Sequence, residues 1–162
     1  MRHRIFLAAL VIPFSAMTSA VADTDHPISA QQRWVALGED ILTDKNTGLQ
    51  WTRRDNGREI DWHEAGRYCE DKRNGWRLPS IAELKAIYDT GVSGTLCGES
   101  LCHLATQFDL TGEWFWSVSP VGPDGSDGPE LAWGLLMVNG AQTPSVREAG
   151  YGARALCVRS AS

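Results

Sequence analysis

Four cysteines constrain the fold of this chain more than any other feature of its sequence. Cys69, Cys97, Cys102 and Cys157 form an even set, which predicts disulfide bonds if the chain is exported to an oxidising compartment. Three pairings are possible. The loop between Cys97 and Cys102 is short and polar and closes easily, which would leave Cys69 to pair with Cys157. The rival interpretation is a zinc site that includes His103, but the cysteines are not at zinc-ligand spacing.

Residues 1–22 are typical of a secretory signal peptide, which would supply that compartment. Arg2 and Arg4 make a positive start, and an apolar run follows over residues 5–17. Small residues then lead to an A-x-A cleavage site that ends at Ala22. The apolar run is shorter than the about 20 residues that a membrane-spanning helix needs. We therefore expect cleavage after Ala22, no transmembrane segment, and a mature chain in the periplasm or outside the cell.

The charge of the chain excludes some classes of partner. The sequence has 15 Lys and Arg against 20 Asp and Glu, a formal net charge of −5. Nucleic acids and anionic membranes require basic surfaces, so neither is expected as a partner. No Lys or Arg lies between Lys85 and Arg147, although seven acidic residues do. If these acidic residues form one surface, it should attract cations or a basic partner and repel sulfated or phosphorylated ones.

Two helices are predicted by their capping signals. Asp61 followed by Glu64, and Ser80 followed by Glu83, match the capping-box pattern that begins a helix. After each signal, apolar residues recur at helical spacing and predict one buried face. The expected helices cover residues 61–73 and 80–91.

Short strands and turns are predicted for the remainder. Alternating and short apolar runs indicate strands at residues 34–37, 41–43, 49–52, 113–119, 131–138 and 154–159. Asn-Gly at residues 139–140 predicts a hairpin with a two-residue turn. We therefore expect one α+β domain over residues 34–162, preceded by a polar leader at residues 23–33.

Several short motifs follow one another in a characteristic order. They are Thr47-Gly48-Leu49-Gln50-Trp51, Trp62…Ala65…Tyr68-Cys69, Trp76-Arg77-Leu78-Pro79-Ser80-Ile81, Phe115-Trp116-Ser117, Ala132-Trp133 and Leu156-Cys157-Val158-Arg159. This order, from about Asp40 to Arg159, resembles the Lcl C-terminal domain family. That family is a bacterial exported domain of poorly known function, found alone and at the ends of surface proteins that include collagen-like adhesins.

The resemblance implies a single C-type-lectin-like domain. Such a domain has two helices and a small twisted, mostly antiparallel sheet, with its N- and C-terminal regions brought together. The resemblance also implies a long disulfide between Cys69 in the first helix and Cys157 in the last strand. The loop between the strands at 113–119 and 131–138 would then occupy the position where lectins of this shape often bind calcium and sugar.

That loop contains a candidate calcium site. Asp124, Asp127 and Glu130 are spaced by three in a Gly- and Pro-rich segment. Calcium takes six to eight oxygen ligands from carboxylates and carbonyls on a flexible backbone, which such a loop can supply in part. The lectin signatures Glu-Pro-Asn and Trp-Asn-Asp are absent, however, and a solvated acidic turn is the alternative interpretation.

Two tryptophans near this loop are candidates for ligand contact. Trp114 and Trp116 fall on one side of the predicted strand and Phe115 on the other. An exposed pair of indoles would form a platform for a sugar ring. Because Trp116 lies in a motif of the family, it is expected in the core, and Trp114 remains as the candidate ligand contact.

The sequence contains no recognised catalytic motif. G-x-S-x-G, H-E-x-x-H and a Gly-rich phosphate loop are all absent. We therefore expect a non-enzymatic exported domain that binds a glycan or a protein at the bacterial envelope or outside the cell. The alternatives are a structural or accessory subunit of an envelope or secretion assembly and, less favoured, an uncharacterised enzyme. No cofactor is expected unless the acidic loop binds calcium.

Overall fold

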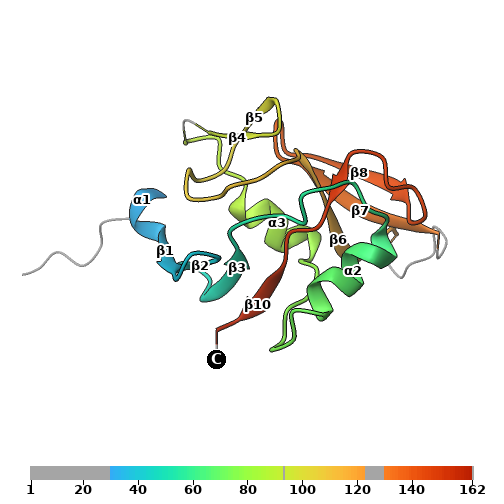
Figure 1. Ribbon diagram of the computed structural model, residues 1–162. Helices are drawn as coiled ribbons and strands as arrows, with labels where there is room; N and C mark the ends of the chain where they lie inside the picture. Colours follow the sequence, from blue (N-terminus) through green and yellow to red (C-terminus); the bar gives the residue numbers. More distant parts are fainter. Residues whose placement is uncertain (1–29, 93, 123–129, 162) are drawn as a thin grey trace, which may run out of the picture.

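The structure is a computed structural model that describes residues 30–92, 94–122 and 130–161 (Figure 1). Its helices are α1 (Ala30–Arg33), α2 (Trp62–Glu70) and α3 (Ile81–Ile87). Its strands are β1 (Trp34–Leu37), β2 (Ile41–Asp44), β3 (Leu49–Thr52), β4 (Thr95–Cys97), β5 (Ser100–Cys102), β6 (Trp114–Pro120), β7 (Leu131–Leu136), β8 (Ala141–Val146), β9 (Ala153–Arg154) and β10 (Val158–Ser160). The predicted α+β class is confirmed. None of these helices is long and apolar enough to cross a membrane.

The strands form three sheets, where the family resemblance implies one small sheet. One four-stranded sheet has the order β1-β2-β3-β10, another has the order β8-β7-β6-β9, and β4 pairs only with β5. All named pairs are antiparallel except β6 with β9. In Figure 1, β10 lies beside β3, so the C-terminal strand completes the N-terminal sheet.

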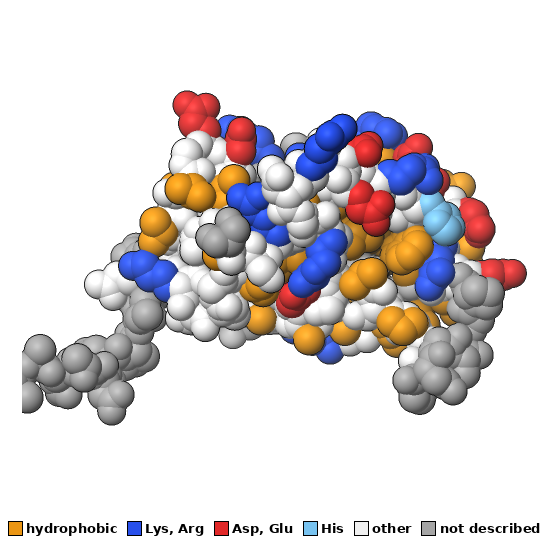
Figure 2. Space-filling model, turned by 90° about the horizontal axis from the view of Figure 1, so that it is seen from below, with side chains coloured by type: hydrophobic (Ala, Val, Ile, Leu, Met, Phe, Trp, Pro, Cys, Tyr) orange, Lys and Arg blue, Asp and Glu red, His pale blue; other side chains and the backbone are white. Residues whose placement is uncertain are grey.

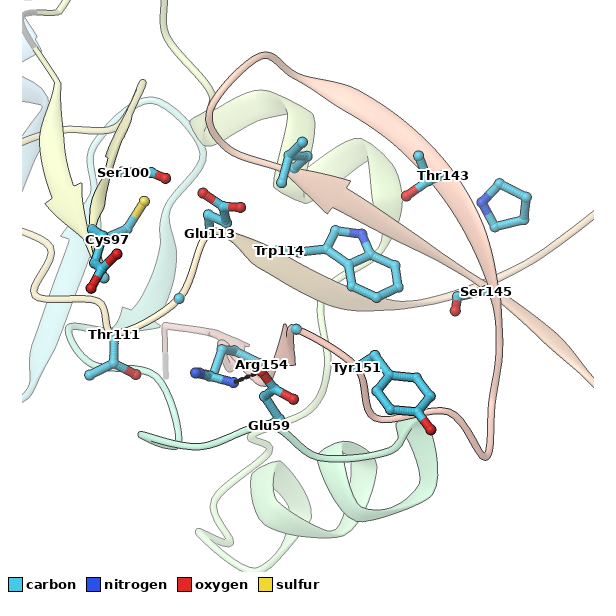
Figure 3. Close-up of a pocket in the computed structure, with 16 residues that line it drawn as sticks. Glu59, Cys97, Ser100, Thr111, Glu113, Trp114, Thr143, Ser145, Tyr151 and Arg154 are labelled. Carbon is cyan, nitrogen blue, oxygen red and sulfur yellow. Dashed lines mark ion pairs between the residues drawn. The ribbon is translucent and has the colours of Figure 1, made fainter.

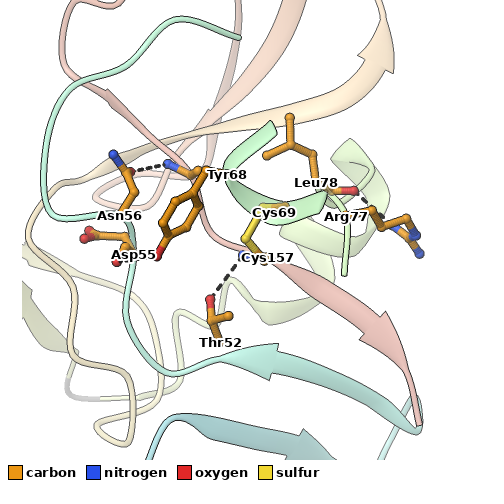
Figure 4. Close-up of a disulfide and its surroundings, with 9 residues drawn as sticks. Thr52, Asp55, Asn56, Tyr68, Cys69, Arg77, Leu78 and Cys157 are labelled. Atoms are coloured by element: carbon orange, nitrogen blue, oxygen red, sulfur yellow. Dashed lines mark hydrogen bonds between the residues drawn. A yellow bond between two sulfur atoms is a disulfide. The ribbon is translucent and has the colours of Figure 1, made fainter. Parts of the chain in front are cut away.

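The last strand is divided between the two large sheets, so the prediction of one continuous strand at 154–159 is wrong. β9 belongs to the second sheet and β10 to the first, and the buried residues 155–157 cross between them. Side-chain oxygens accept hydrogen bonds from backbone N–H groups of this crossing segment (Figure 4). Asn56 Oδ1 accepts from Ala155 N at 2.7 Å, and Thr52 Oγ1 accepts from Cys157 N at 3.2 Å. Buried N–H groups need such partners where a strand ladder is interrupted.

Both main helices begin where their capping signals predict. The side chain of Asp61 accepts from Glu64 N at 2.7 Å. At α3 the capping box is complete, because Ser80 Oγ accepts from Glu83 N while Ser80 N donates to Glu83. The helices end earlier than predicted. The backbone of Tyr88 is already extended, so α3 stops before the expected Gly91.

The β7–β8 hairpin has a four-residue loop, and the predicted two-residue turn at 139–140 is wrong. Leu136 pairs with Ala141, which places residues 137–140 in the loop. Met137 lies just beyond β7 with its side chain fully buried in the core, and its N–H donates to Glu113 O at 2.8 Å. Its carbonyl accepts from His103 N at 2.8 Å, which joins the loop to the segment after β5.

The apolar core has two parts, one on each side of β6. Phe115 faces the larger part, between the first sheet, α3 and the second sheet, and Trp116 faces the smaller part beneath α2. Consecutive residues of a strand point to opposite faces, so β6 contributes to both. The side chain of Trp116 is fully buried, which confirms its predicted place in the core.

Both disulfides join the cysteines as expected. Cys69 of α2 is bonded to Cys157 in the crossing segment, and Cys97 of β4 is bonded to Cys102 of β5. No cysteine is free. Figure 4 shows the long disulfide between α2 and the crossing segment, beside Thr52 of β3. A zinc site built on these thiols is therefore ruled out.

A salt bridge attaches the N-terminal strands to α3. Arg33 donates from Nε and Nη2 to the fully buried carboxylate of Asp44 at 2.7 and 2.6 Å, and Nη2 also donates to Ala86 O at 2.9 Å. Burial raises the pKa of the Asp44 carboxyl. The hydrogen bonds from Arg33, from the Asn46 N–H and from Thr47, with the charge of Arg33, outweigh burial and hold that pKa below its ordinary value.

We predict that removal of the long disulfide destabilises the fold more than removal of the short one. The closed chain spans 88 residues for Cys69–Cys157 and 5 for Cys97–Cys102. In the chain-entropy model these loops stabilise by about 4–5 and about 2 kcal/mol, respectively. Urea unfolding of the Cys69→Ala/Cys157→Ala and Cys97→Ala/Cys102→Ala double variants measures both losses. A larger loss in the second variant would contradict the prediction.

We predict that Asp44→Asn lowers the free energy of unfolding at neutral pH by about 1–3 kcal/mol. Because the pKa of Asp44 is lowered in the folded state, its contribution is fully present above its unfolded-state pKa, about 3.9. The contribution is lost as the pH falls through the folded-state value, so the parent and the variant should converge in acid. Urea unfolding of both proteins from neutral to acidic pH tests this.

Asp40→Asn is the matched control, because the Asp40 side chain is 77% exposed. Its effect should be small at every pH. A difference between the parent and Asp44→Asn that persists unchanged in acid would contradict the role of the Asp44 charge.

Candidate functional site

An open cleft lies between the β4–β5 hairpin, the second sheet and the loop before β9 (Figure 3). Its volume is about 590 Å³, within the range of about 300–1,000 Å³ typical of small-molecule sites. The lining combines aromatic, hydroxyl and carboxylate side chains with a single arginine among the described residues. These side chains come from segments far apart in the sequence, which only the fold brings together.

Asp55 is not a lining residue itself, but it holds the backbone of one wall of the cleft. Its side chain is nearly buried, and its carboxylate accepts from Thr111 N and Thr111 Oγ1, both at 2.7 Å, and from Gly112 N at 3.2 Å. It also accepts from Gly57 N at 2.8 Å, which closes its own turn. Asp55 therefore fixes the segment at 111–112 that leads into β6.

Arg154 reaches the cleft across Gly112. A Cβ at Gly112 would lie 2.6 Å from Arg154 Cγ, so only glycine leaves room for the arginine stem. The Arg154 side chain is 15% exposed, and its Nη1 lies 4.0 Å from Glu59 Oε1. Neither Nε nor Nη1 of Arg154 has a hydrogen-bond partner in the described part of the chain. Two of the three guanidinium nitrogens, Nε and Nη1, are thus buried without a hydrogen-bond partner in the described structure.

Trp114 lies in the middle of the cleft in Figure 3. Its indole packs across Gly134 of β7, where a Cβ would lie 2.6 Å from Trp114 Cε2. Its ring centroid is 5.0 Å from that of Trp116. Trp114 is half-buried and Trp116 is fully buried, so the two do not form an exposed platform. Of the two tryptophans, Trp114 lines the cleft, where the sequence predicts a ligand contact.

Tyr151 and Arg154 are the cleft residues that sequence reasoning missed. Tyr151 is 85% exposed and lies between Gly150 and Gly152 in the loop before β9. The signal for it was an aromatic residue flanked by glycines, where a core position is not expected. No local signal marks Arg154, because its role depends on the distant Gly112.

Of the three predicted calcium ligands, Glu130 is the one among the described residues, and it does not line this cleft. Asp124 and Asp127 lie outside the described residues. Glu130 is exposed immediately before β7, and its carbonyl accepts from Arg147 N at 2.7 Å. Within residues 30–92, 94–122 and 130–161, no group of three or more His, Cys, Asp or Glu could hold a metal ion.

Many of the basic side chains outside the cleft have partners. Figure 2 shows one face on which Lys and Arg alternate with acidic and hydrophobic side chains. Arg54 pairs with Asp40 and Asp109, at 2.8 and 2.9 Å. Arg77 pairs with Glu83 at 2.7 Å, and this hydrogen bond lowers the pKa of Glu83 below its ordinary value. These arginines act mainly as structural ion pairs.

The chain matches the family model of the Lcl C-terminal domain over residues 40–159. This range covers most of the chain and runs from the turn before β2 to β10. The protein therefore belongs to the Lcl C-terminal domain family, as the order of its motifs predicts. No curated protein matches the chain.

We predict that Asp55→Ala destabilises the fold by about 2–3 kcal/mol, because it removes the acceptor of three backbone N–H groups and of the Thr111 hydroxyl. Asp109→Ala is the matched control, since the Asp109 side chain is 59% exposed and pairs only with Arg54 in the described structure. Urea unfolding of both variants measures the two losses. Equal, small losses would show that Asp55 does not support the cleft wall.

Proposed function

We propose that the chain is an exported, non-enzymatic binding domain that recognises a glycan or a protein at the bacterial envelope or outside the cell. The observation that carries this proposal is the cleft itself. It places the exposed Tyr151 and the half-buried Trp114 beside Arg154, whose Nε and Nη1 have no hydrogen-bond partner in the described structure. Aromatic surface combined with a few polar groups is typical of ligand sites.

Export is supported by two independent features. Residues 1–22 have the pattern of a cleaved signal peptide. The two disulfides, which involve all four cysteines, are typical of proteins that fold in oxidising compartments. The periplasm and the exterior of the cell both meet this condition.

A C-type-lectin-like fold is part of the proposal. Three observations support it: the pairing of β3 with β10, the two main helices, and the disulfide from α2 to the segment before β10. The acidic loop at residues 123–129 lies outside the described structure, and calcium binding there is a hypothesis from the sequence alone.

The hydrogen bonding of the Thr111 hydroxyl group, which lies close to the Asp55 carboxylate, favours a binding role over catalysis. Thr111 Oγ1 donates to Asp55 Oδ1 at 2.7 Å, but that carboxylate also holds backbone N–H groups. The arrangement is that of a structural turn. An activated nucleophile would instead face the cleft beside a base free to take its proton.

A second candidate is an accessory subunit that docks on a larger envelope or secretion assembly. It is favoured by the β4–β5 hairpin, where Leu96 and Leu101 are paired across the strands and are 67% and 52% exposed. The adjacent Cys97–Cys102 disulfide braces this apolar tip. Exposed apolar side chains of this kind mark interaction surfaces more often than isolated ones do.

The experiment is a parallel screen of the oxidised mature protein against a glycan array and against solubilised envelope proteins. We expect selective binding in one of the two, and an N-terminus at Asp23 in protein recovered from the periplasm or the medium. A stoichiometric protein partner lost in Leu96→Ala/Leu101→Ala, without glycan affinity, would favour the accessory subunit. Binding to neither set would overturn the proposed function.

A further inference from the structure

We propose that the cleft binds a neutral saccharide, with a sugar ring against Tyr151 and Trp114 and its hydroxyl groups hydrogen-bonded to Arg154 and Glu113. This inference rests on the proposed function, because it names the ligand class of the same cleft. It is argued from three properties of the cleft: its unsatisfied donors, its charge and its aromatic side chains.

The first property is the incomplete hydrogen bonding of Arg154. A guanidinium that is largely removed from water normally has its N–H groups satisfied. Here the contact with Glu59 is 4.0 Å long, beyond hydrogen-bond length. Glu59 is 55% exposed and does not enclose the guanidinium. A ligand oxygen that displaces the exposed Glu59 side chain would supply the buried Nη1 of Arg154 with an acceptor.

The second property is the negative balance of the cleft. Glu59, Glu99 and Glu113 line it, against Arg154 as the single cation among the described lining residues. Sulfated, phosphorylated or uronic sugars would be repelled by this set. Carboxylates only accept hydrogen bonds, so the ligand must donate to them as well as accept from Arg154. A hydroxyl group does both without adding charge.

The lining also contains hydroxyl side chains, which suit a polyhydroxylated ligand. They are Ser100 and, from the edge strand β8, Thr143 and Ser145, whereas the Thr111 hydroxyl is already bonded to Asp55. In Figure 3 Thr143 and Ser145 lie on the far side of Trp114 from Cys97 and Ser100. Polar groups therefore border the indole on both sides, as hydroxyls around a sugar ring would require.

The third property is the aromatic pair. Tyr151 projects from a glycine-flanked loop with 85% of its surface exposed, so it has little packing role in the free protein. Trp114 is held rigidly against Gly134. The apolar C–H face of a neutral sugar can cover aromatic rings of this kind while its hydroxyls stay polar. A cationic peptide would match the carboxylates but would bring a like charge close to Arg154.

The test is titration calorimetry of the oxidised mature protein with neutral oligosaccharides selected on an array that also carries sulfated and uronic ones. We expect Tyr151→Ala and Arg154→Met each to weaken the binding of the best neutral ligand by about tenfold or more. Leu37→Ala is the control, because Leu37 of β1 is 53% exposed and does not line the cleft. It should bind as the parent does. Thermal melts verify that each variant is folded, and Tyr151→Ala is informative even if Arg154→Met does not fold.

The affinity for a neutral ligand should also be insensitive to salt, with less than about a twofold change between about 50 and 500 mM NaCl. A preference for sulfated or uronic glycans would overturn the inference. So would neutral-glycan binding that Tyr151→Ala leaves unchanged, or capture of a protein with no glycan affinity, and in these cases the proposed function stands. Binding to neither glycan nor protein would overturn both.

Discussion

The structure depends on the segment at residues 155–157, which crosses from the second sheet to the first. The Cys69–Cys157 disulfide ties this segment to α2, and Asn56 and Thr52 supply its hydrogen bonds. Both sheets and the packing of α2 meet here, so a displacement of this segment would disturb all three. A covalent link over a long loop also restricts the unfolded chain more than any local contact in the domain does.

The cleft lies next to this crossing segment. β9 immediately precedes the crossing segment and pairs with the start of β6, which sets Arg154 opposite Phe115 and Ala153 opposite Trp114. Asp55 holds the other edge by fixing Thr111 and Gly112. Two glycines then allow the side chains to lie close to the backbone, Gly112 under Arg154 and Gly134 under Trp114. The site is therefore held by buried structure while its ligand-facing side chains remain accessible.

The sequence correctly predicted those features that depend on interactions between residues close together in the chain. The starts of α2 and α3 follow from Asp61 and Ser80, because capping involves atoms within one helical turn. Prediction from the sequence failed at the β7–β8 loop and in the last strand. At the loop, burial of Met137 and its bond to His103 override the Asn-Gly turn preference. In the last strand, β9 pairs with β6 of the second sheet, and no local sequence pattern predicts this pairing.

The sequence by itself determined the α+β class, the helix starts, the disulfide-forming cysteines and membership of the Lcl C-terminal domain family. These properties follow from short-range spacing, composition and the order of motifs. Only the tertiary structure decided that Arg154, Trp114 and Tyr151 share one cleft. The physical reason is that the cleft forms through strand pairing and close packing against glycines, and the residues involved are distant in the chain. Contacts of this kind produce no regular spacing that could be recognised in the sequence.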